Sequence, residues 1–147
     1  MSEYIHKEHN VSVLLYHYVC PAKYRRVIFD DSVDMVLVQT CKEISKRYDI
    51  NILEIGTDGD HVHFLIQSVS MLAPTQIVRT IKSITAKEIY RLCPQVKEKL
   101  WGGNIWSAGY FVSTFGRNGN ENQIKNYVRN QGKEYTQIHR GQLKLFD

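Results

Sequence analysis

The residues from Ile50 to Ser68, INILEIGTDGDHVHFLIQS, decide the fold of this 147-residue chain. Two strand-like runs rich in Ile, Val and Phe, residues 50–56 and 61–68, lie on either side of a short polar segment. That segment contains Asp58-Gly59, and an Asp-Gly pair between apolar runs is a strong indication of a tight turn between antiparallel strands. The stretch therefore predicts a β-hairpin in the middle of the chain.

The residues before this hairpin predict one strand and one helix. Residues 11–19 are β-branched and aromatic and stop at Cys20-Pro21, which is typical of a strand that ends in a turn. A helix follows, with Asp31 or Ser32 as its cap, because apolar residues recur there at intervals of three and four. Its expected inward positions are Val33, Val36, Leu37, Cys41, Ile44 and Tyr48.

The residues after the hairpin predict a helix, a strand and a final helix. Pro74 suits the first turn of a helix that runs to about Arg91 and is ended by Pro94. A fourth strand lies within residues 105–115, and a last helix starts near Asn120 after a glycine-containing break.

The order β-α-β-β-α-β plus one extra helix indicates the fold class. It predicts an α+β protein with a ferredoxin-like antiparallel sheet, helices on one face and an additional C-terminal helix. A length of 147 residues suits one domain. We therefore expect a single domain over residues 1–147, with a core over about 10–135 and a C-terminal tail over 136–147.

Composition restricts the compartment and the partners. The net charge is +4, which is weak evidence for a polyanionic partner because solvated basic surfaces are common. The three cysteines are widely spaced, which indicates reduced, partly buried thiols. The first residues do not resemble a signal peptide, and no apolar segment approaches the ~20 residues that span a bilayer. We expect a cytoplasmic protein with no membrane partner.

His61 and His63 are the first candidate site. Side chains alternate between the faces of a strand, so both imidazoles point the same way. If Val62, Phe64 and Ile66 meet the helices, the two histidines face away from them. One interpretation is a pair of metal ligands; the other, favoured for an isolated His-x-His, is a chance pair of strand histidines. The neighbouring Asp60 is a plausible hydrogen-bond partner or simply a turn residue.

Tyr127 and Gln131 are the second candidate site, four residues apart on the predicted last helix. Positions i and i+4 share a helix face, so the phenol and the amide can approach one point. Alone, each would be a core, boundary or solvated residue. Together with two imidazoles, Gln131 would leave a divalent ion cationic and open to a phosphate. Tyr127 would then attack a phosphodiester as a nucleophile, with no nucleotide cofactor.

These residues resemble those of the single-tyrosine HUH transposases of the bacterial insertion-sequence 200/605 family. HUH stands for histidine, hydrophobic residue, histidine. The matching segments, in order, are Tyr16-His17-Tyr18-Val19 with Lys23-Tyr24-Arg25-Arg26, His61-Val62-His63, Trp106 to Thr114 with Gly116, and Tyr127 with Gln131. The resemblance covers about residues 10–135.

The resemblance implies an activity and an assembly. It implies cleavage and rejoining of single-stranded DNA near hairpins at the ends of a mobile element, through a 5'-phosphotyrosine intermediate and with Mg²⁺ or Mn²⁺. It also implies a homodimer in which the tyrosine helix of one subunit completes the metal site of the other. The cell would be bacterial or archaeal.

Basic residues supply the candidate DNA contacts. They are Lys23, Arg25 and Arg26 after the first strand, and Arg79 and Lys82 on the second helix. Such side chains would contact phosphates, and Tyr24 or another exposed aromatic would stack on an unpaired base. A solvated basic face is an equally good explanation for any one of them. Trp101 and Trp106 are expected in the core or in a dimer contact rather than as platforms for bases, and His17 in a strand hydrogen bond rather than facing DNA.

Two other functions remain open from the sequence. A replication-initiator or relaxase nickase uses the same histidine motif, although usually in a longer chain. A non-catalytic RNA-recognition-type module shares the β-α-β-β-α-β order, but it would carry exposed aromatic residues on a central strand, where this chain has its histidine pair.

Overall fold

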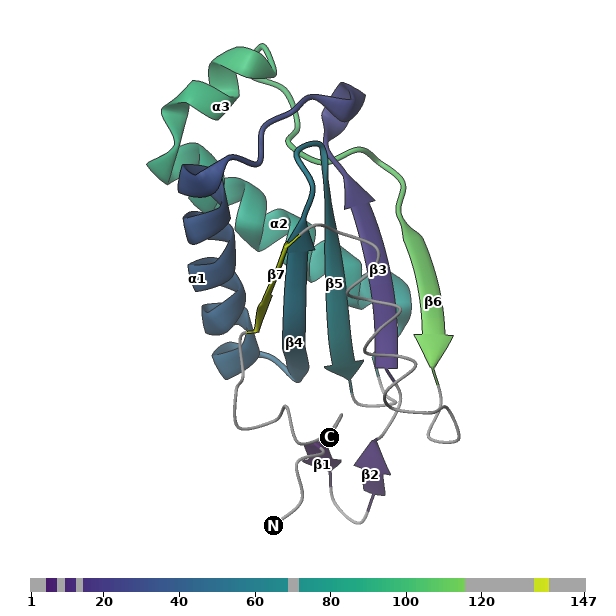
Figure 1. Ribbon diagram of the computed structural model, residues 1–147. Helices are drawn as coiled ribbons and strands as arrows, with labels where there is room; N and C mark the ends of the chain where they lie inside the picture. The colour runs from purple at the N-terminus through teal and green to yellow at the C-terminus, as the bar shows by residue number, and fades with distance from the viewer. Residues whose placement is uncertain (1–4, 8–9, 13–14, 69–71, 116–133, 138–147) are drawn as a thin grey trace.

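The computed structural model describes residues 5–7, 10–12, 15–68, 72–115 and 134–137 (Figure 1). In chain order its elements are β1 (Ile5–Lys7), β2 (Asn10–Ser12), β3 (Leu15–Pro21), the 3₁₀ turn η1 (Lys23–Arg25), α1 (Asp31–Arg47), β4 (Ile50–Thr57), β5 (His61–Ser68), α2 (Pro74–Leu92), α3 (Pro94–Lys99), β6 (Phe111–Phe115) and β7 (Glu134–Gln137).

The main sheet has five antiparallel strands in the order β6-β3-β5-β4-β7. The predicted β-α-β-β-α-β order is confirmed. It is formed by four of the five strands, β3, β4, β5 and β6, together with the helices α1 and α2. β5 lies between β3 and β4, so the histidine-bearing strand is hydrogen-bonded on both sides. The predicted last helix near Asn120 lies outside the described residues.

The β4–β5 hairpin forms as predicted. Asp58 N donates to the carbonyl oxygen of His61 at 3.0 Å and closes the turn. Gly59 has a φ of +69°, a left-handed conformation that L side chains rarely adopt, so the Asp-Gly pair supplies the backbone freedom this turn needs. The segment before α1 also holds the turn of the hairpin in place, because Phe29 N donates to Gly59 O at 3.0 Å.

The N-cap of helix α1 lies one residue before the first of its two predicted caps. Asp30, rather than Asp31 or Ser32, is the N-cap, and its carboxylate accepts from Val33 N at 3.0 Å. The side chain of Ser32 instead donates to Asp30 at 2.7 Å. The predicted inward residues Val33, Leu37, Cys41 and Ile44 are buried, whereas Tyr48 is the C-cap and is exposed.

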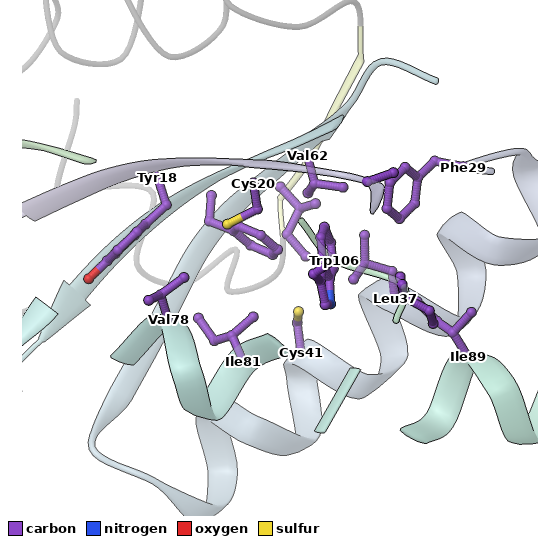
Figure 2. Close-up of a cluster of buried hydrophobic side chains, with 14 of the residues drawn as sticks. Tyr18, Cys20, Phe29, Leu37, Cys41, Val62, Val78, Ile81, Ile89 and Trp106 are labelled. Carbon is purple, nitrogen blue, oxygen red and sulfur yellow. The ribbon is translucent and has the colours of Figure 1, made fainter. Parts of the chain in front are cut away.

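The hydrophobic core lies between the sheet and helices α1 and α2, which cover one face of it (Figure 1). Figure 2 shows side chains from both layers meeting there, with Trp106 among them. The Trp106 ring lies 5.4 Å from that of Phe29 and 6.4 Å from that of Phe64, centroid to centroid. Trp106 is thus a core residue, one of its two predicted placements. Cys20, Cys41 and Cys93 are buried free thiols.

Replacing Thr85 with valine is expected to destabilise the fold by about 1–3 kcal/mol, because it leaves a buried indole N–H without its acceptor. Trp106 Nε1 donates to Thr85 Oγ1 at 3.0 Å in the core. Thr80 of the same helix provides the matched control: both hydroxyls donate to the carbonyl four residues earlier, at 2.6 Å for Thr85 and 2.9 Å for Thr80. Urea unfolding of the two Thr→Val proteins measures the difference. Equal losses would show that the indole bond contributes nothing.

Four elements were not predicted: β1, η1, α3 and β7. Pro94 does follow the end of α2, but it also starts α3, since a proline is well tolerated in the first turn of a helix. The first sheet strand begins at Leu15, and residues 10–12 pair with β1 in a separate two-stranded sheet. β7 lies across the predicted boundary between the core (to about residue 135) and the C-terminal tail (136–147), and it pairs with β4 from Glu54↔Gln137 to Thr57↔Glu134. Strands pair through backbone N–H and C=O groups, which every non-proline residue has, so polar residues are able to form this edge strand.

The described residues contain no helix that is both long enough and apolar enough to cross a bilayer.

Candidate metal and DNA site

His61 and His63 lie on the sheet face opposite the helices. Val62, Phe64 and Ile66 alternate with them along β5 and belong to the core formed with α1 and α2. The predicted orientation is therefore confirmed. The two imidazole centroids are 4.9 Å apart, His63 is 3% exposed, and the side chain of His61 is 17% exposed.

Each imidazole of the pair makes a hydrogen bond through Nδ1. His61 Nδ1 lies 2.7 Å from Asp60 Oδ1, and a carboxylate accepts, so Nδ1 carries the proton. His63 Nδ1 lies 3.0 Å from His17 Nε2. When His63 donates in that bond, Nε2 is the lone-pair nitrogen on both His61 and His63. Both rings then have the tautomer that a metal ligand needs.

His17 is the residue that the sequence did not connect to this site. It was expected in a strand hydrogen bond, and the structure supplies its partner. In the β3–β5 ladder Val19 is opposite His63, which puts His17 diagonally across from it, and the two rings stack at 13° with centroids 5.2 Å apart. Burial lowers the pKa of His17 to about 4, so the ring is neutral at pH 7 and is able to accept a hydrogen bond.

Asp60 joins the histidine pair to the basic segment after β3. Arg25 contacts both carboxylate oxygens, with Nε 3.2 Å from Oδ2 and Nη2 3.3 Å from Oδ1. The hydrogen bond from His61, followed by that from Arg25, holds the pKa of Asp60 below its ordinary value. Asp60 is therefore the partner of His61 that the sequence allowed, and Arg25, predicted to contact DNA, lies beside the histidine site.

The described residues supply two of the three predicted metal ligands. Two neutral imidazoles fit a divalent ion and leave its charge uncompensated, which suits an anionic substrate. Over the described ranges, no group of three or more His, Cys, Asp or Glu side chains is placed to hold a metal ion. Gln131, the predicted third ligand, and Tyr127, the predicted nucleophile, lie outside the described residues.

The remaining predicted DNA contacts fall in two places. Lys23 and Arg26 belong to the same segment as Arg25, and their side chains lie over the rings of Tyr24 and Trp101. Arg79 and Lys82 instead line an open cavity of about 570 Å³ between α2 and residues 104–110. Lys82 Nζ donates to the carbonyl oxygens of Ser107 at 2.9 Å and Gly109 at 3.0 Å, so it also braces this segment. The structure therefore does not bring the five basic residues together.

Comparison with known proteins places the chain in a family. Residues 10–131 match the family model described as "Transposase IS200 like". The ISDra2 transposase TnpA of Deinococcus radiodurans is 30% identical over 118 residues, which is 80% of this chain and 84% of that protein. The transposase for insertion sequence element IS200 of Salmonella typhimurium is 25% identical over 119 residues, covering 81% of this chain and 77% of that one.

Solved structures of two transposases are similar to this chain. A Deinococcus radiodurans crystal structure described as that of a transposase superposes with a TM-score of 0.69 at 25% identity, covering 88% of this chain and 99% of that one. A REP-associated tyrosine transposase bound to a REP hairpin shares the fold, with a TM-score of 0.56 at 13% identity over 87% of this chain and 68% of that one. The chain belongs to the IS200-like transposase family, as its sequence motifs indicated.

Proposed function

We propose that this transposase cleaves and rejoins single-stranded DNA through a covalent bond between Tyr127 and a 5'-phosphate. The observation that carries the proposal is the histidine pair: both rings lie on one face of β5, and a hydrogen bond at Nδ1 holds each of them in place. The family membership of the chain supports the same chemistry.

The reaction is a transesterification. The phenolate oxygen of Tyr127 forms a bond to phosphorus, and the bond from phosphorus to the 3'-oxygen breaks; the leaving 3'-oxygen takes a proton from water and becomes a 3'-hydroxyl. A phenol has a pKa of about 10, so positive charge at the site is required to favour the phenolate. A bound Mg²⁺ or Mn²⁺ would supply such charge and polarise a non-bridging phosphate oxygen. Attack by another 3'-hydroxyl reverses the step, and no nucleotide cofactor is needed.

Hairpin-containing single-stranded DNA is the proposed substrate, and a homodimer is the proposed assembly. A fold relative is bound to a REP hairpin. In this chain, Lys23 and Arg26 would contact DNA phosphates near the histidine pair, and Arg79 would contact a phosphate at the cavity beside α2. Such contacts would make the affinity for DNA depend on salt concentration.

A covalent adduct tests the proposal directly. The full chain is incubated with single-stranded DNA from its own genomic flanks, with Mg²⁺, Mn²⁺ or EDTA, and resolved on a denaturing gel. We expect a metal-dependent adduct whose nucleotide maps to Tyr127 by peptide mass spectrometry. Addition of a second DNA with a free 3'-hydroxyl should release it as a joined strand. Release without joining would favour a nickase, and tight binding with no adduct under any metal would favour a binding module.

Replacing His17 with phenylalanine is expected to weaken Mn²⁺ binding roughly 10- to 100-fold, the usual cost of losing an outer partner of a metal-binding histidine. His17→Gln is the matched control, because its amide oxygen can still accept from His63 Nδ1. Calorimetric titration of the DNA-free protein with Mn²⁺ measures both. If the two variants bind Mn²⁺ as the wild type does, His17 does not orient His63.

A further inference from the structure

Two large aromatic side chains, Tyr24 and Trp101, form an exposed surface that we call the aromatic platform. Tyr24 is 67% exposed and Trp101 is 74% exposed, and their ring centroids are 6.3 Å apart. Trp101 was expected in the core or in a dimer contact, and its exposure rules out the core. Isolated exposed apolar residues are common, but two adjacent aromatic rings are not explained by that tendency.

The platform has an unfavourable backbone. Among the described residues, the non-glycine residues with positive φ are Tyr24 at 58°, Arg25 at 53° and Trp101 at 53°. Bulky residues avoid this region, and when they adopt it the surrounding structure holds them there, commonly at ligand sites. Here Lys23 N donates to Ile105 O at 2.7 Å, and Gly102 N donates to Lys97 O at 2.7 Å, which fixes both segments. These hydrogen bonds maintain the unfavourable backbone conformation at the two residues whose rings are exposed.

Cations surround the platform. The guanidinium carbon of Arg26 lies 4.4 Å from the centroid of the Trp101 ring, and Lys23 Nζ lies 5.4 Å from that of Tyr24. Aromatic rings with adjacent Lys and Arg are the pattern by which proteins bind single-stranded nucleic acid: bases stack on the rings and phosphates meet the cations. The charge therefore favours a polyanion with exposed base faces.

The platform is linked to the histidine pair through two residues, Arg25 and Asp60. Arg25, which follows Tyr24, contacts Asp60, and Asp60 in turn contacts His61. Ala22 N also donates to Asp60 O at 2.8 Å. Figure 1 shows η1, the β4–β5 turn and the segment after α3 at the same end of the sheet. DNA that lies on the platform is therefore close to a phosphate at the histidine pair.

We propose that the aromatic platform binds an unpaired base of the single-stranded DNA next to the phosphate that is cleaved. Lys23 and Arg26 contact the phosphate of that nucleotide. This inference rests on the proposed function for the position of the cleaved phosphate. Base-paired DNA hides its base faces by stacking, so the platform selects unpaired nucleotides over duplex.

The test compares affinities for unpaired and paired DNA. The Tyr24→Leu/Trp101→Leu protein is titrated with fluorescent oligothymidine and with a blunt-ended duplex that has no unpaired base. Because stacking is worth about 5- to 150-fold in affinity per base, we expect at least about tenfold weaker binding of oligothymidine and little change for the duplex. Tyr48→Leu, which removes another exposed aromatic at the end of α1, is the control and should bind as the wild type does.

Further readouts separate the possible outcomes. Quenching of the Trp101 fluorescence by oligothymidine should disappear in both Trp101→Leu and Trp101→Phe. The affinity for oligothymidine should fall in Trp101→Leu and be retained in Trp101→Phe, because phenylalanine keeps an aromatic ring. Unchanged oligothymidine affinity in the double variant would overturn the proposal, as would a change in oligomeric state, seen by sedimentation, without a change in affinity. If the wild type forms the covalent adduct and the double variant binds oligothymidine as tightly as the wild type does, the platform is refuted and the strand-transfer chemistry is not. If the double variant binds oligothymidine more weakly but no protein forms an adduct, the strand-transfer chemistry is refuted and the platform is not.

Discussion

The Tyr127→Phe protein is expected to form no covalent adduct with single-stranded DNA while binding that DNA as tightly as the wild type. Phenylalanine keeps the ring and removes only the oxygen that would bond to phosphorus. The buried tyrosines Tyr16 and Tyr18 are poor substitutes, because burial raises the pKa of each phenol and favours its neutral form. The denaturing-gel assay with Mn²⁺ measures the adduct, and fluorescence anisotropy measures binding.

Tyr48→Phe is the matched control for this experiment. Tyr48 is an exposed tyrosine at the end of α1, so its hydroxyl should be dispensable and its adduct yield unchanged. An adduct that persists in Tyr127→Phe would refute Tyr127 as the nucleophile. Peptide mapping of that adduct would then identify the residue that carries the DNA.

The His63→Ala protein is expected to bind Mn²⁺ more weakly than the wild type. The loss of affinity should exceed the roughly 10- to 100-fold caused by removing a hydrogen-bond partner of a metal-binding histidine, because here the proposed ligand itself is removed. Adduct formation should fall with it. His63 is buried, so the substitution also removes packing and the partner of His17. Thermal unfolding in EDTA is therefore measured alongside Mn²⁺ titration, so that loss of metal affinity is separated from loss of fold.

His6→Ala is the control for the histidine substitution. His6 belongs to β1, in the two-stranded sheet that is separate from the sheet carrying the site. Its removal should leave Mn²⁺ affinity unchanged. If folded His63→Ala protein bound Mn²⁺ as the wild type does, the histidine pair would not be the metal site.

Much of the fold was predictable because it depends on neighbours in sequence. The hairpin follows from Asp58-Gly59 and the backbone freedom of Gly59, and α1 follows from its apolar spacing. The shared face of His61 and His63 follows from the alternation of a strand. The assignments of Tyr127 and Gln131 also come from the sequence, and they remain predictions because those residues lie outside the described ranges.

Tertiary structure decided which distant residues surround the histidine pair. The contact between His17 and His63 depends on the register of β3 against β5, and no local pattern fixes the register between strands separated by a helix and another strand. β7 likewise forms by backbone pairing with β4.

The sequence by itself determined the type of the six elements β3, α1, β4, β5, α2 and β6, the family motifs and the face on which the histidines lie, because turn conformation and side-chain periodicity are local. Only the tertiary structure decided that Arg25 contacts Asp60, that Lys82 braces residues 107–109, and that Trp101 is exposed beside Tyr24. Such contacts depend on how chain segments meet in three dimensions, so residue type alone does not distinguish a DNA contact from a structural ion pair or a buried ring from an exposed one.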